Sequence, residues 1–410
     1  MYIAAATLLG FASSSIVSAA PSGWYQNSGS WDYKGSGIRS YSPGSSPVSY
    51  SLTPAPTEVH PDGNKFRFPL SNDFPNPNQD EINDIEENAG GILPNGKAPS
   101  PPKNRDSITN LQLIAFNELF EVAFFTDLLK NVTGGKDGYS HPTWSQDFLV
   151  EILTTVQAQE ELHLLNANGA LKAFGGAFGV DPVKPCEYVF PTQNLDDAIA
   201  LAALFTDVVL GTLQDVETIF ANDQDNDFIR GVASVIGQEG EQEGFYRLFQ
   251  GKRPSAQPFL TASARDFAFS ALQMFVVPGS CPNIDQIPLK IFAPLNVLTN
   301  VTEPKDQTVE FSFTFPSNST YLPDGYEPSS DFDLVFISGQ DAPIIANIDD
   351  DSVTIKNGVA DFKATFPGKT NLLFGLTIAA VVEGGKINAN SNVDDVAKFT
   401  IAGPGLIETI

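Results

Sequence analysis

The segments Gln159-Glu160-Glu161-Leu162-His163 and Gln238-Glu239-Gly240-Glu241-Gln242 carry closely similar patterns of acidic and amide residues. Each follows a segment that contributes one further glutamate, Glu121 before the first and Glu217 before the second. A glutamate on one helix and Glu-x-x-His on the next, occurring twice, is the arrangement by which some four-helix bundles hold two metal ions. The sequence therefore predicts a four-helix bundle, with Gln242 where the pattern has a histidine.

The glutamates occupy positions on the apolar faces of the predicted helices. Residues three and four apart share one face of a helix, and on the fourth helix Glu239 and Gln242 interrupt an otherwise apolar face, formed by Phe228, Val232, Val235, Tyr246 and Phe249. A buried carboxylate without a partner is costly. Carboxylate and imidazole ligands suit Fe, Mn or Zn, so acidic groups in matching positions on four helices indicate a shared cluster of about two such ions. The alternative is a metal-free bundle that keeps a buried polar network.

Aligning the two halves of the helical region assigns roles to the individual residues. Glu121 falls opposite Glu217, so these two are the predicted single-glutamate ligands. Glu118 falls opposite Gln214, and we expect both to contact ligands rather than the metal. The predicted ligand set is Glu121, Glu160, His163, Glu217, Glu239 and Gln242.

The helical period defines one domain, at residues 105–290. It predicts four long helices and a fifth that packs outside them, at residues 106–130, 145–175, 195–221, 227–249 and 261–276. Apolar and polar residues then alternate, which predicts a β-rich domain over residues 300–410. Its expected strands are 309–315, 333–338, 352–355, 360–366, 372–382 and 397–401, and Asn357-Gly358 is a hairpin turn signal. The predicted fold is α+β: a four-helix bundle plus a fifth helix, followed by a small β-sandwich-like domain.

The N-terminal part of the chain has a different composition. Residues 1–19 combine a short apolar run with small residues before Ala20-Pro21, as in a secretory signal peptide. Residues 20–104 are rich in Ser, Gly, Pro, Asn and Tyr, which predicts a low-complexity, largely disordered arm. A processed pro-segment is the alternative for this part.

Composition and cysteine content limit the partners and the compartment. The net charge of −26 argues against nucleic acid and anionic membranes as partners. After the signal peptide we expect no membrane-spanning helix, because no run of eighteen apolar residues follows it. Cys186 and Cys281 are the two cysteines, and export would make them a disulfide. Asn131, Asn300 and Asn318 begin glycosylation motifs, which we expect in loops or at edges.

The chain resembles the ferritin-like domain proteins that fungi secrete, of the stress-response and sexual-development type. The resemblance covers about residues 105–300 and is carried by residues 117–121, 159–163 and 237–246. It implies a bundle with a dinuclear site at Glu121, Glu160, His163, Glu217 and Glu239, and it places the second histidine at Gln242.

Two classes of function follow from these features. The first is a metal-dependent oxidoreductase or redox protein that carries two Fe, Mn or Zn ions. The second is a metal-free structural protein of the cell wall or extracellular matrix, which the arm, the glycosylation motifs and the β domain suit. Iron storage in a closed shell is less favoured, because the arm and the β domain would obstruct a cage.

Overall fold

The structure is a computed structural model that describes residues 65–315 and 331–410. The predicted signal peptide, residues 20–64 of the predicted arm and Asn318 lie outside the described residues. All described residues belong to one compact unit.

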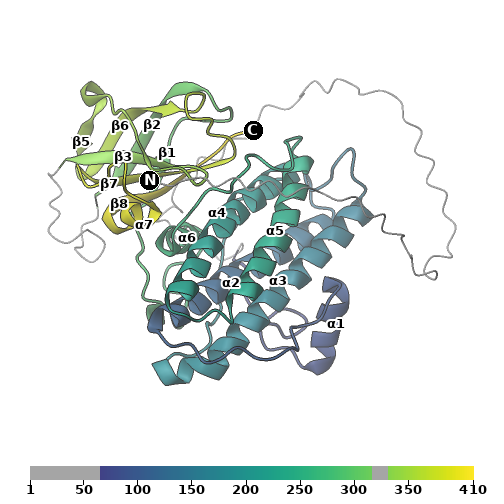
Figure 1. Ribbon diagram of the computed structural model, residues 1–410. Coiled ribbons are helices and arrows are strands. Elements are labelled where there is room, and N and C mark those ends of the chain that lie inside the picture. The colour runs from purple at the N-terminus through teal and green to yellow at the C-terminus, as the bar shows by residue number, and fades with distance from the viewer. Residues whose placement is uncertain (1–64, 316–330) are drawn as a thin grey trace, which may run out of the picture. The chain divides into compact units, whose positions relative to one another are not determined.

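Four long helices form the bundle, and Figure 1 shows them side by side. They are α2 (Arg105–Thr133), α3 (Gln146–Phe174), α4 (Leu195–Asn222) and α5 (Ile229–Phe249). Ser145 caps α3 by accepting a hydrogen bond from Phe148 N, and Asn194 caps α4 in the same way from Asp197 N. Aromatic rings fill the core. For example, the ring centroids of Phe120 and Phe205 lie 5.0 Å apart, and the two rings meet edge to face. The four predicted helices are therefore confirmed.

The fifth predicted helix is shorter than expected, because α6 spans only Arg265–Leu272. Residues before it bond to the β-rich region instead: Thr261 Oγ1 donates to Leu376 O at 2.6 Å, and Ala262 N donates to Gly339 O. Val276, beyond its end, pairs with Tyr188 in a β-bridge. At both ends of the predicted helix, these contacts with other segments take the place of further helical turns. Short 3-10 helices lie at Gly175–Phe178, Ile284–Gln286 and Asp350–Ser352.

Residues 65–104 are ordered against the bundle, so the expectation of a disordered arm does not hold for this part. Helix α1 (Gln79–Ala89) begins with a capping box between Asn78 and Glu81 and packs on α3. Phe74 is 0 % exposed, and Phe66 N donates to Tyr188 O at 2.8 Å. The segment has few apolar residues, but the bundle offers a surface on which those few become buried.

The C-terminal region contains two antiparallel four-stranded sheets, with strand orders β1-β2-β6-β5 and β4-β3-β7-β8. The strands are β1 (Leu295–Val297), β2 (Asp306–Thr314), β3 (Phe332–Ile337), β4 (Ile344–Ile345), β5 (Thr354–Lys356), β6 (Val359–Pro367), β7 (Leu376–Glu383) and β8 (Thr400–Glu408). Phe311 of one sheet and Phe336 of the other pack in one core, which confirms the predicted β domain.

Two local features of the β region can be compared directly with the predictions from the sequence. Asn357 and Gly358 both have positive φ, 52° and 79°, and join β5 to β6 as the hairpin signal predicts. The strand predicted at 397–401 is wrong in its first half, because helix α7 (Val393–Phe399) occupies that segment and β8 begins at Thr400. A capping box between Asn392 and Asp395 starts this helix.

Two further contacts tie the chain together. The bundle packs on the β region through a separate apolar core, where Leu204 and Val208 of α4 meet Ile337 and Ile378. Cys186 and Cys281 form a disulfide, as predicted.

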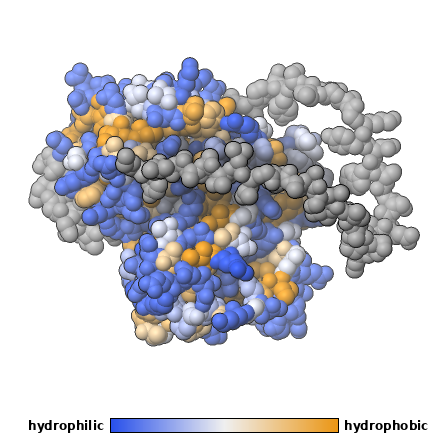
Figure 2. Space-filling view, in the orientation of Figure 1, coloured by the Kyte–Doolittle hydropathy of each residue, from blue (hydrophilic) through white to orange (hydrophobic). Residues whose placement is uncertain are grey.

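In the described residues, α4 is the one helix that is long and apolar enough to cross a membrane. Of its most apolar window, 78 % is buried inside the protein, as in the core helix of a bundle. On the face shown in Figure 2, hydrophilic residues cover most of the surface that carries colour.

Candidate metal centre

Three helices bring four potential metal ligands together in the bundle core. Glu118 comes from α2, Glu160 and His163 from α3, and Glu239 from α5. One ligand atom from each lies within 4.8 Å of all the others. Carboxylate oxygens and an imidazole nitrogen are the ligand types that Fe, Mn and Zn share. We call these four residues the metal centre.

The Nδ1 atom of His163 faces all three carboxylates of the metal centre. It lies 2.7 Å from Glu160 Oε2, 3.6 Å from Glu118 Oε2 and 3.8 Å from Glu239 Oε1. Glu160 and His163 share a helix face because they are three residues apart on α3. The three-residue spacing in the sequence therefore places two of the four residues of the metal centre next to each other.

The carboxylates are removed from water, which shifts their protonation. Glu118, Glu160 and Glu239 are each at most 1 % exposed. Burial raises the pKa of Glu118 to about 7, with His163 partly opposing the change. Burial, together with the charges of Glu118 and Glu160, raises the pKa of Glu239 well above its ordinary value. Burial lowers the pKa of His163, but Glu160 and Glu118 outweigh it, so this pKa ends well above the ordinary value.

Several buried carboxylate oxygens lack a hydrogen-bond partner. In and beside the metal centre they are Glu118 Oε2, Glu121 Oε1 and both oxygens of Glu239. A buried acceptor without a partner costs about 1–3 kcal/mol, and more if it is charged. A cation bound between these oxygens would satisfy them together, so the residues present fit a metal ion.

Glu121 lies beside the metal centre rather than within its 4.8 Å group. Its side chain is buried, at 2 % exposure. Burial is the main cause that raises its pKa well above the ordinary value, and the charges of Glu160, Glu239 and Glu118 add to it. Glu118, which was predicted to be a neighbour of the ligands, therefore belongs to the metal centre. Glu121, which was predicted to be a ligand, lies beside it.

Gln242 acts on Glu160 through a hydrogen bond. Its Nε2 donates to Glu160 Oε1 at 2.8 Å and to Gln159 Oε1 at 3.1 Å. The carbonyl oxygen, which is the atom able to bind a metal, instead accepts from Tyr246 OH at 3.4 Å. In this arrangement the Gln242 amide group orients Glu160, and its carbonyl oxygen is directed to Tyr246.

Glu217 and Gln214 of α4 do not reach the metal centre, in contrast to the prediction. Asn110 Nδ2 donates to Val216 O at 3.1 Å, which places Glu217 level with Asn110. Asn110 is eight residues from Glu118, or about 12 Å along α2. Gln214 accepts a hydrogen bond from Gln340 Nε2, on the β-rich side.

Apolar side chains occupy the place on α4 that Glu217 was predicted to fill. Phe205, which contacts Phe120, is buried in the bundle core, as are Val209 and Leu213. Alignment of the two halves placed Glu217 opposite Glu121, but α4 is displaced along the bundle so that Glu217 lies level with Asn110. This axial stagger keeps Glu217 out of the metal centre. The same alignment paired Glu118 with Gln214 and so left it out of the predicted ligand set, although Glu118 lies three residues before Glu121 and shares its helix face.

Two of the predicted glycosylation residues lie in the described part. Asn300 is exposed. Asn131 lies in the last turn of α2 rather than in a loop, and its Nδ2 donates to Asp127 Oδ2 at 3.0 Å.

Comparison with known proteins agrees with this geometry. Residues 107–252 match the family model of the ferritin-like domain. This segment includes nearly all of α2, all of α3 to α5, and every residue of the metal centre. The chain therefore contains a ferritin-like domain. A search of curated proteins finds no match.

Proposed function

We propose that the ferritin-like domain binds metal ions at Glu118, Glu160, His163 and Glu239 and uses them for redox chemistry. One observation carries the proposal: both oxygens of Glu239 are buried without a partner next to two other carboxylates and an imidazole. A metal-free polar network would have to leave these oxygens unpaired or protonated. A bound cation satisfies them without either cost.

The number of acidic groups supports more than one ion. Glu121 adds a fourth buried carboxylate beside the three of the metal centre, and it too has an unpaired oxygen. Four carboxylates balance two divalent ions in charge, and we propose two Fe ions, with Mn or Zn as alternatives. When bound, Fe or Mn ions would supply electron transfer to dioxygen or peroxide, which would make the protein an oxidoreductase.

The residues around the centre prepare it for that chemistry. His163 and Gln242 each bond one oxygen of Glu160 and so fix its orientation. Phe125 stacks on Tyr246 with ring centroids 6.1 Å apart, and both side chains are buried. These rings keep bulk water away from the carboxylates, which strengthens their attraction for a cation.

Elemental analysis of the purified, untagged protein tests the proposal. The metal-free protein is incubated separately with Fe(II) under anaerobic conditions, with Mn(II) and with Zn(II), and is then desalted. We expect about one to two ions per chain. The Glu239→Gln variant should lose them, whereas Glu241→Gln, an exposed neighbour on the same helix, should retain them. Negligible metal in the wild-type protein would instead favour the metal-free structural role.

We further propose that the protein is secreted to the cell wall or the surrounding matrix and acts in a stress response. The disulfide between Cys186 and Cys281 supports an oxidising compartment. The resemblance to secreted fungal proteins supports the stress role. N-terminal sequencing of protein from the culture medium should find Ala20 as the first residue. A full-length chain retained inside the cell would contradict secretion.

A further inference from the structure

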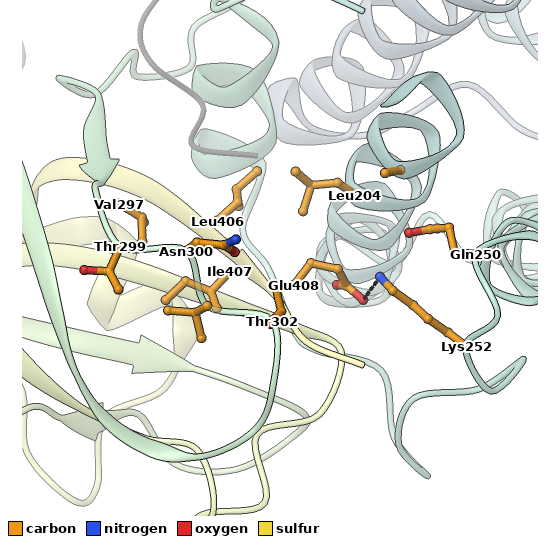
Figure 3. A pocket seen from close by; sticks show the side chains of 12 residues that line it. Leu204, Gln250, Lys252, Val297, Thr299, Asn300, Thr302, Leu406, Ile407 and Glu408 are labelled. Atoms are coloured by element: carbon orange, nitrogen blue, oxygen red, sulfur yellow. Dashed lines mark ion pairs between the residues drawn. The ribbon is translucent and has the colours of Figure 1, made fainter. Parts of the chain in front are cut away.

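A second group of buried charged residues lies where α5 meets the β-rich region. Arg247 of α5 is 1 % exposed, and its Nη1 lies 2.6 Å from Glu408 Oε1 at the end of β8. Its Nε donates to Arg253 O at 2.8 Å, but its Nη2 has no hydrogen-bond partner. Lys252 approaches the same oxygen of Glu408 at 3.6 Å, and Figure 3 shows this pair. The guanidinium group therefore keeps one donor nitrogen unpaired inside the protein.

Glu243, one turn before Arg247 on α5, is the acidic counterpart. Its side chain is 4 % exposed, and neither of its carboxylate oxygens has a hydrogen bond. Within the residues that the structure describes, no ion pair joins Glu243 to a basic side chain. Burial raises its pKa well above the ordinary value, and the charge of Asp207 adds to this, whereas Arg247 opposes it. An acid and a base on the same helix thus both lack a partner.

Both of these side chains line one cleft of about 100 Å³. Asp207 of α4 adds a second carboxylate to the wall of this cleft. Most of the remaining wall is apolar, and it includes Leu210 of α4 and Leu376 of β7. We call this space the interface cleft. It combines an acidic group, a basic group and an apolar wall in one small space.

The uncharged polar side chains of the interface cleft already have partners. Ser255 Oγ donates to Gln257 O at 3.0 Å, and Gln257 Nε2 donates to Thr261 Oγ1 at 2.9 Å. Thr261 Oγ1 in turn donates to Leu376 O at 2.6 Å. The unpaired groups that a ligand would meet are therefore the acid and the base of α5.

Charge and size together define the ligand. A lone cation would leave Arg247 Nη2 unpaired, and a lone anion would leave Glu243 unpaired, so both charges are needed in one molecule. The two residues are four apart, which places their Cβ atoms about 5–6 Å apart on one side of α5. A volume of about 100 Å³ equals that of about three waters and is smaller than the roughly 150 Å³ cavity that binds benzene. Glycine is smaller than benzene and carries an ammonium and a carboxylate group on one carbon.

We propose that the interface cleft binds a small zwitterion, an α-amino acid with little or no side chain, between Glu243 and Arg247. Glu243 and Asp207 accept hydrogen bonds from its ammonium group, whose three donors match the two oxygens of Glu243 and one of Asp207. Arg247 Nη2 donates a charge-assisted hydrogen bond to its carboxylate, and the apolar wall limits the size of its side chain. The four residues of the metal centre lie outside the lining of the cleft. This site therefore does not depend on the proposed function.

Saturation-transfer NMR on the full-length protein tests the site. Glycine is the zwitterionic probe, and ethylamine and acetate each carry only one of its two charges. We expect glycine to bind with a dissociation constant on the order of 1 mM. Ethylamine and acetate should bind at least about tenfold more weakly, because each leaves one buried charged group unpaired.

Variants of α5 locate the binding. Glu243→Gln should weaken glycine binding at least about tenfold, because the amide loses the charge that attracts the ammonium group. Arg247→Lys should weaken it as well, since the lysine nitrogen is engaged by Glu408 and no second nitrogen remains for the carboxylate. Glu241→Gln removes the same charge as Glu243→Gln at an exposed position and should bind glycine as the wild type does.

Each of the contrary outcomes overturns the proposal. Equal binding of glycine, ethylamine and acetate would show that the site does not recognise a zwitterion. Wild-type glycine binding by Glu243→Gln would place the ligand elsewhere, and no glycine signal at tens of millimolar would show that water alone pairs with these groups. Thermal unfolding checks the variants: Glu243→Gln removes an uncompensated buried charge, so it should melt no lower than the wild type. If Arg247→Lys does not fold, the comparison of glycine with ethylamine on the wild type tests the role of the base.

Discussion

Glu160 and His163 form the closest pair in the metal centre, with Nδ1 and Oε2 2.7 Å apart. The other oxygen of Glu160 accepts from Gln242. Glu160 is therefore fully engaged within the protein, whereas both oxygens of Glu239 have no partner. Glu160 and Glu239 occupy equivalent positions in the two sequence patterns, but only the carboxylate of Glu239 lacks hydrogen-bond partners. Glu239 is therefore the residue of the metal centre that most depends on a cation.

The variant Glu239→Gln should be more stable than the wild type when both are free of metal. The change removes a buried, unpaired carboxylate next to Glu118 and Glu160, which we expect to stabilise the fold by about 1–3 kcal/mol at neutral pH. Urea unfolding of the metal-free proteins measures it. Saturating metal should reverse the order, since only the wild type gains binding energy. A variant that is less stable in both states would contradict this prediction.

Substitutions at Glu118 and Glu217 should affect metal binding very differently. Glu118→Ala removes a ligand atom 3.6 Å from His163 Nδ1, so we expect metal binding to weaken by at least about a hundredfold. Glu217→Ala should bind as the wild type does, because this side chain lies about 12 Å away along the bundle. Calorimetric titration with Zn²⁺ compares the two. The reverse order would show that α4 does supply a ligand.

The stability of the metal-free protein should fall as the pH rises from about 5 to 8. Burial raises the pKa of Glu118 from its ordinary value of 4.5 to about 7. Between these values the folded state binds more protons than the unfolded state, so its free energy of unfolding decreases with rising pH. We expect the melting temperature to drop by about 5 °C. In Glu118→Gln this dependence should be weaker, and an identical slope would exclude Glu118 as its source.

Gln242→Leu should weaken metal binding about tenfold without changing the number of ions bound. Leucine cannot donate to Glu160 Oε1, so the carboxylate loses the 2.8 Å bond that orients it. Zinc titration and elemental analysis together distinguish affinity from stoichiometry. Loss of one ion per chain would instead identify Gln242 as a ligand.

Removal of the disulfide should destabilise the protein by about 3–5 kcal/mol in the chain-entropy account, because Cys186 and Cys281 are 95 residues apart. Chemical denaturation of the Cys186→Ser, Cys281→Ser double variant measures the loss. Metal content should be unchanged, because neither cysteine belongs to the metal centre. A stability equal to that of the wild type would show that the bond constrains little of the unfolded chain.

The sequence was sufficient for features that depend on neighbours along the chain. The four long helices follow from their apolar period, and Glu160 with His163 follows from the three-residue spacing that places two side chains on one face. The Asn357-Gly358 hairpin follows from the positive φ that both residues adopt. Each of these is decided within a few residues, so local chemistry is enough.

Only the tertiary structure decided which carboxylates meet. The sequence favoured Glu121 and Glu217 as ligands and Glu118 as their neighbour, whereas the structure brings Glu118 into the metal centre. The axial stagger between α2 and α4 leaves Glu217 level with Asn110, away from that centre. Packing of Phe120 against Phe205 is part of what fixes that stagger, and no local pattern encodes it. Residues 65–104 follow the same logic, since their few apolar side chains become ordered only on a surface that distant helices create. Axial position and docking depend on contacts between segments far apart in the chain, and these exist only once the bundle has formed.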